Sequence, residues 1–181
     1  MYIEEFREAV KRTKEFGLVV PPIVPDPQKR FLTKETMQDL MKAIFKTIGQ
    51  PGPEELTAQC FEINHGIKLI IDDFFKTTSV FTLGWIDEPS HCLCKCTEEE
   101  LKSLLVNGIS NTNLGLHAWI TMPSMEIFDV TINTKIAIAN DEPELVYAIA
   151  ARHVDELAEG FAYHPLLLGD DYLNRLGLYL Y

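Results

Sequence analysis

A long helical pattern followed by short apolar segments most constrains the fold. Between residues 56 and 74 apolar side chains recur every three or four positions, which predicts a helix with one buried face. Segments 79–86, 114–122 and 126–138 are rich in β-branched and aromatic residues and predict strands, the last two as an antiparallel pair. A helical N-terminal part packed on an antiparallel sheet, an α+β fold, is therefore expected.

Helix signals surround this pattern. Thr33 is a candidate N-cap, and Thr97 with Glu100 has the spacing of a capping box. We expect helices at 1–16, 33–49, 97–107 and 141–157, and a short one after Asp170. Pro53 is the expected start of the central helix, which would place Cys60 two turns inside it.

Size and charge narrow the class of protein. The 181 residues fit a single domain, 1–181, and the formal net charge of −11 argues against nucleic acid as a partner. No apolar run reaches the roughly 20 residues that cross a bilayer, and no basic-then-apolar leader opens the chain. We expect a soluble cytoplasmic protein without a membrane partner, although secretion without a cleavable signal would leave no trace in this sequence. Its oligomeric state is left open.

Three residue types suit thiol chemistry. A cysteine becomes nucleophilic when an imidazolium stabilises its thiolate, and a carboxylate orients that imidazole. Cys60 lies on the predicted helix, whereas His117 and Asp129 lie on consecutive predicted strands. Cross-strand neighbours lie about 5 Å apart at Cβ, so the carboxylate can reach the imidazole if the register brings Asp129 opposite His117.

The order helix Cys60, strand His117-Ala118-Trp119 and strand Asp129-Val130-Thr131 resembles the core of transglutaminase-like and papain-like cysteine enzymes. The segment Gln59 to Glu62, with Asn64, is similar to the nucleophile region of arylamine N-acetyltransferases, which share that fold. The resemblance covers about residues 53 to 138. It implies a papain-like or transglutaminase-like core.

The resemblance also implies an activity. Cys60 would be the nucleophile, His117 the general base and then acid, and Asp129 the group that orients the imidazole. A thioester intermediate on a protein or peptide-like amide would lead to hydrolysis, deamidation or transfer, with no cofactor. In the family the cysteine usually begins its helix, so either the helix starts near Thr57 or His117 supplies most of the activation.

The family commonly stabilises the oxyanion with the backbone N–H of the cysteine and a side-chain donor. Gln50, Gln59 and Trp85 are the candidates for that donor.

Competing interpretations remain. His153 lies on a predicted apolar helix stripe and competes for the imidazole role, although such a histidine is more often a core residue. His91, Cys92, Cys94 and Cys96 carry metal-ligating atoms, but their spacing differs from the Cys-x2-Cys pairs of zinc sites, so we expect a strand and no metal. An inactive interaction or immunity-type protein that keeps the fold is the alternative function.

Overall fold

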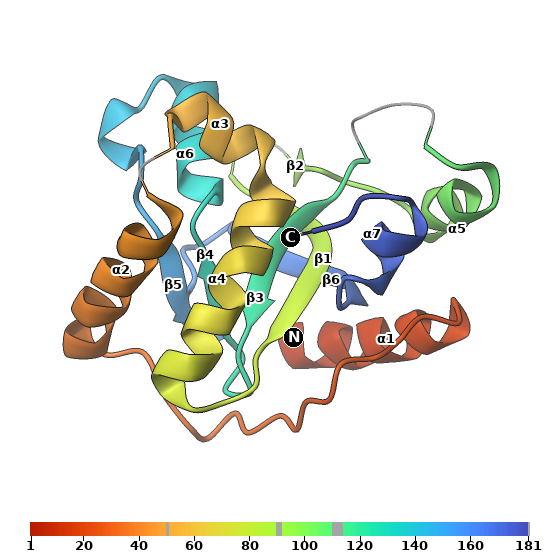
Figure 1. The fold of residues 1–181 in the computed structure, drawn as a ribbon, viewed down its shortest axis with the longest axis horizontal. Coiled ribbons are helices and arrows are strands. Elements are labelled where there is room, and N and C mark those ends of the chain that lie inside the picture. The colour runs from red at the N-terminus through yellow and green to blue at the C-terminus, as the bar shows by residue number, and fades with distance from the viewer. Residues whose placement is uncertain (50, 90–91, 110–113, 181) are drawn as a thin grey trace.

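The structure is a computed structural model that describes residues 1–49, 51–89, 92–109 and 114–180, with only the backbone of Cys92. Figure 1 shows its helices arranged around one sheet. The described helices are α1 (Tyr2–Glu15), α2 (Lys34–Ile48), α3 (Pro53–Ala58), α4 (Cys60–Phe75), α5 (Glu98–Asn107), α6 (Ile132–Asn140) and α7 (Asp171–Arg175). The described strands are β1 (Val80–Asp87), β2 (Cys92–Leu93), β3 (His117–Thr121), β4 (Glu126–Asp129), β5 (Ala150–His153) and β6 (Ala162–Leu168).

The sheet is antiparallel at every recorded pairing. Its strands lie in the order β6, β1, β3, β4, β5. The short β2 pairs with Ile86 and Asp87, beyond the part of β1 that pairs with β3. The predicted mixed α+β class with an antiparallel sheet is therefore confirmed.

Helices cover both faces of the sheet. Buried residues of α2 and α4, such as Leu40 and Ile67, form one core with Ala118 and Ile120 of β3. Phe6 of α1 belongs to a second core with Trp119. Since successive strand residues point to opposite faces, the fully buried β3 supplies side chains to both cores.

Several predicted elements are confirmed. The helices at residues 1–16, 33–49 and 97–107, the short helix after Asp170 and the strand at 79–86 all appear within a residue or two. Thr33 and Thr97 cap α2 and α5 as expected, because each hydroxyl accepts a hydrogen bond from the N–H three residues later. No helix in the described part of the chain is both long and apolar enough to cross a membrane.

The expected single helix from Pro53 through Phe74 is wrong. The chain forms α3 and then α4, which are separated by Gln59 with φ −106° and ψ 36°. Cys60 is consequently the first residue of α4, not a residue two turns inside a helix.

The predicted strand at 126–138 is also wrong beyond Asp129. Oδ1 of Asp129 accepts hydrogen bonds from the N–H groups of Thr131 and Ile132, which turns the chain out of β4 and into α6. A side chain thus supplies the acceptor that a neighbouring strand would otherwise provide.

The expected helix at 141–157 is not formed. Its residues make two 3-10 turns, Pro143–Leu145 and Val154–Glu156, on either side of β5. Strand β5 pairs with β4, so contact with the sheet outweighs the local helical spacing. Strand β6, in the expected C-terminal tail, was not predicted and pairs with β1.

Candidate active site

Cys60 occupies the first turn of a sixteen-residue helix. The i to i−4 backbone ladder ends at Gln59, whose N–H bonds to Glu55, and resumes at Ile63, whose N–H bonds to Gln59. The first N–H groups of a helix have no partner inside it and carry partial positive charge, which stabilises a nearby thiolate. The sequence offered a helix start near Thr57, but Thr57 lies in α3 and the helix that carries the cysteine starts three residues later, at Cys60 itself.

His117 and Asp129 form a buried pair. Nε2 of His117 lies 2.7 Å from Oδ2 of Asp129, and both residues have no exposed surface. The recorded pair of Ile120 with Phe128 places Asp129 across from Trp119, so His117 is its diagonal neighbour on the same face. The expected contact is present, but by a diagonal and not by direct opposition.

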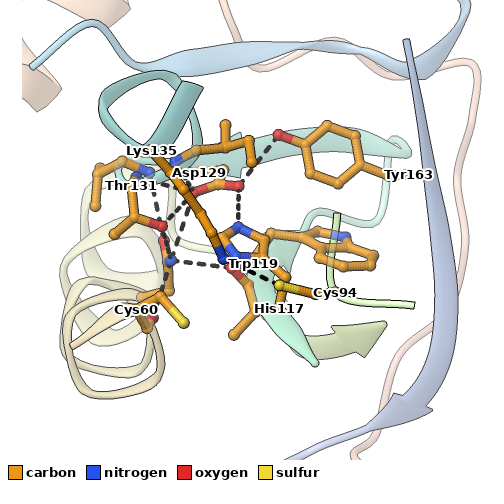
Figure 2. Close-up of polar contacts among 12 residues, drawn as sticks. Cys60, Cys94, His117, Trp119, Asp129, Thr131, Lys135 and Tyr163 are labelled. Atoms are coloured by element: carbon orange, nitrogen blue, oxygen red, sulfur yellow. Dashed lines mark hydrogen bonds and ion pairs between the residues drawn. The ribbon is translucent and has the colours of Figure 1, made fainter. Parts of the chain in front are cut away.

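Asp129 is held by several other donors. Oδ1 accepts from the hydroxyl and the N–H of Thr131, both at 2.9 Å, and Oδ2 lies 3.2 Å from the hydroxyl of Tyr163 on β6. Figure 2 shows the carboxylate between these groups and the imidazole ring. A carboxylate with this many donors stays ionised and fixed in orientation.

Asn64 joins the helix to the strands. Its Nδ2 lies 3.0 Å from the carbonyl oxygen of Cys60 and 3.0 Å from that of Ala118, and its Oδ1 lies 3.4 Å from the N–H of Val130. One turn separates Asn64 from Cys60, so the same buried amide contacts the backbone next to His117 and the backbone next to Asp129. This side chain fixes the start of α4 against β3 and β4.

The electrostatics of the pair favour charge separation. Burial lowers the pKa of His117, but the charge of Asp129 and the hydrogen bond to it outweigh burial and raise the pKa above its ordinary value. Burial raises the pKa of Asp129, whereas His117 and Thr131 outweigh it and hold that pKa below its ordinary value. An imidazolium beside a carboxylate is the stable form of this pair at neutral pH.

The second ring nitrogen of His117, Nδ1, is the atom that could interact with the Cys60 thiol. Cys60 adds to the raised pKa of His117 through its proximity and charge. Within the described residues, however, Nδ1 of His117 is buried without a hydrogen-bond partner, so the thiol does not meet hydrogen-bond geometry in this conformation. With Nε2 engaged by Asp129, Nδ1 is the nitrogen available to Cys60.

The three predicted oxyanion donors differ in where they lie. Gln50 lies outside the described residues, and Gln59 directly precedes Cys60 with an exposed side chain. Trp85 stacks on His164 at 3.8 Å between ring centroids and lies 4.7 Å from the ammonium of Lys95. Trp85 is thus engaged by other side chains.

His153, the competing imidazole, lies on β5 and not on a helix. It pairs with Glu126, three residues along β4 from Asp129, and its Nδ1 accepts a hydrogen bond from the N–H of Asp155. The structure therefore does not bring it to the His117–Asp129 pair.

The remaining thiols differ in setting. Burial, with a smaller contribution from Glu100, raises the pKa of Cys96 to about 11, which disfavours its thiolate. Cys94 lies past the end of β2 with φ 58°, so residues 92–96 do not form the expected strand with three thiols on one face. No group of three metal-ligating side chains converges among the described residues, to which His91 and the Cys92 side chain do not belong.

Sequence reasoning missed Lys135 beside the pair and considered Cys94 only as a metal ligand. Lys135 extends from α6 and its Nζ lies 3.0 Å from Sγ of Cys94 (Figure 2). Neither the lysine nor this cysteine stands in a motif with Cys60, and no sequence signal predicted their contact.

Comparison with protein-family models, with curated proteins and with solved structures gives no match for this chain. The resemblance to transglutaminase-like and papain-like enzymes stays a prediction.

Proposed function

We propose that this protein is a thiol-dependent acyl-transfer enzyme that acts on a protein or peptide-like amide. The observation that carries the proposal is the 2.7 Å contact between His117 and Asp129, which leaves Nδ1 for the first residue of α4, Cys60. The candidate nucleophile, imidazole and orienting carboxylate come from the separate elements α4, β3 and β4, whose backbones are linked by hydrogen bonds to Asn64. We also propose that the core has a transglutaminase-like or papain-like fold.

The residues divide the reaction between them. Cys60 is the thiolate, which the start of α4 and the imidazolium of His117 stabilise. Its sulfur bonds to the carbonyl carbon, and the C=O electron pair moves to oxygen. As that pair returns, the bond to the leaving nitrogen breaks and His117 gives this nitrogen its proton.

The thioester on Cys60 is then opened by water or by a second amine. His117, now neutral, takes the proton of the incoming group, and Asp129 stabilises the imidazolium that forms again. Water yields hydrolysis or deamidation, and an amine yields transfer. We place this chemistry in the cytoplasm, where the free thiols Cys60, Cys94 and Cys96 stay reduced.

An acyl donor tests the proposal directly. Incubation with 4-nitrophenyl acetate should release 4-nitrophenolate and leave an acetyl group on Cys60, located by peptide mass spectrometry. Cys60→Ala should abolish both signals. Cys96→Ala should leave them unchanged, because the raised pKa of Cys96, about 11, keeps it a thiol at neutral pH.

A non-catalytic interaction protein is the second candidate. The exposure of Cys60 is 9% and that of His117 is 0%, so little of either side chain is accessible to a substrate. Absence of acetylation of Cys60 in the wild-type protein would favour this candidate over the enzyme.

A further inference from the structure

Lys135 brings a positive charge to the candidate triad. It lies four residues after Thr131 on α6, and Figure 2 shows its side chain reaching across from α6 toward Cys94, beside the ring of His117. Burial lowers the pKa of Lys135, but its hydrogen bond to Cys94 and the nearby Cys94, Cys60 and Asp129 outweigh burial and raise that pKa. The side chain therefore remains an ammonium at neutral pH.

The ammonium of Lys135 has more hydrogen-bond donors than recorded partners. It carries three N–H groups, and its recorded partner is the sulfur of Cys94, a weak acceptor. Within the described part of the chain, Lys135 makes no ion pair with a carboxylate, unlike Lys68 on α4, which pairs with Asp72. A half-buried cation with a weak partner can exchange that partner for a charged oxygen at little cost.

The backbone at Cys94 supports a functional role for this contact. A φ of 58° is uncommon for a residue with a side chain and disfavoured by its Cβ. Such strained positions cluster at functional sites, where the surrounding structure maintains them. Here the strained residue presents its sulfur to Lys135.

Building on the proposed function, we propose that Lys135 is the side-chain donor to the oxyanion that forms when Cys60 attacks a carbonyl. Nζ–H of Lys135 replaces the sulfur of Cys94 with the developing O⁻, and the backbone N–H of Cys60 is the second donor. The proton stays on Lys135 throughout. Lys135 thus takes the role that the sequence offered to Gln50, Gln59 or Trp85.

Two probes of Cys60 separate this role from a structural one. Acylation by 4-nitrophenyl acetate passes through an oxyanion, whereas alkylation by iodoacetamide is a displacement at a saturated carbon and forms none. Lys135→Met should slow acetylation of Cys60 by about 100-fold, the usual effect of losing one oxyanion donor. Alkylation in the same variant should fall by less than about 5-fold, since the thiolate still faces His117 and the start of α4.

One control variant completes the design. Lys42→Met removes an exposed ammonium from α2 and should change neither rate.

The outcomes are distinct. Equal loss of acetylation and alkylation in Lys135→Met, or unchanged acetylation, overturns the oxyanion role of Lys135. If wild-type Cys60 is not acetylated at all, the proposed enzymatic function itself fails.

Discussion

Asn64 is the residue on which the alignment of helix and strands depends. Its buried amide bonds to backbone groups of Cys60, Ala118 and Val130. Asn64→Ala should lower the free energy of unfolding by about 2 to 4 kcal/mol, because several buried polar groups lose their partner at once. Urea unfolding followed by circular dichroism measures this loss.

Asn107→Ala is the matched control for that prediction. Asn107 lies at the end of α5, where its amide bonds to the exposed Ser103. Its replacement should change the unfolding free energy by less than about 0.5 kcal/mol. Equal effects of the two substitutions would show that Asn64 does not hold the site together.

Individual residues of the site were predictable to different extents. Cys60, His117 and Asp129 could be predicted because thiol chemistry needs those residue types and each stands in a recognisable element. Lys135 and Cys94 could not, because their contact spans 41 positions and depends on how α6 and the turn after β2 fold. Asn64 carried a weak signal, since it follows Cys60 by one helical turn.

Among the elements, those with strong local signals were predicted well. Capping by Thr33 and Thr97 and the apolar spacing of α2 and α5 are local properties of the sequence. The start of α6 was missed because the Asp129 side chain accepts from the following backbone, and β5 was missed because it depends on pairing with β4. The break at Gln59 was missed as well. The break at Gln59 matters most for function, since it puts Cys60 at a helix start.

Alanine substitutions at two glycines, Gly84 in β1 and Gly66 in α4, should have opposite effects on stability. A Cβ at Gly84, the β1 residue that pairs with His117, would lie 2.1 Å from the carbonyl oxygen of His164 and 2.7 Å from Trp119. Gly84→Ala should therefore force β1 and β6 apart beside the site and destabilise the protein by more than about 2 kcal/mol. Thermal unfolding provides the comparison with the wild-type protein.

Gly66→Ala provides the contrasting substitution. A Cβ at Gly66, inside α4, meets no heavy atom within 4 Å. Alanine should stabilise α4 by about 0.5 to 1 kcal/mol, because glycine costs that much in a helix interior. A neutral Gly84→Ala would contradict the close packing of β1 against β6.

For the molecule as a whole, the His117–Asp129 pair makes stability depend on pH. The raised pKa of His117 contributes stability that is complete below the unfolded value of about 6.5 and is lost as pH rises through the folded value. The lowered pKa of Asp129 contributes stability above the unfolded value of about 3.9, lost as pH falls through the folded value. The pair should therefore stabilise the protein most between about pH 4 and about pH 6.5.

Asp129→Asn tests this dependence, with Cys60→Ala in both proteins so that the thiol does not titrate. The difference in unfolding free energy between the two should shrink by about 1 kcal/mol or more from about pH 6 to about pH 9, because one unit of pKa displacement corresponds to about 1.4 kcal/mol. Urea titrations at intervals of one pH unit give the profile. A difference that is constant over this range would exclude a charged pair.

In the proposed mechanism His117 makes Cys60 a reactive thiolate, and the rate of alkylation of Cys60 measures that reactivity. At neutral pH, iodoacetamide should label Cys60 at least about 10-fold faster than Cys96, whose raised pKa of about 11 disfavours the thiolate, with sites assigned by peptide mass spectrometry. His117→Gln should bring Cys60 down to the slow rate. Uniformly slow labelling in the wild-type protein, or fast labelling that survives His117→Gln, would contradict the account.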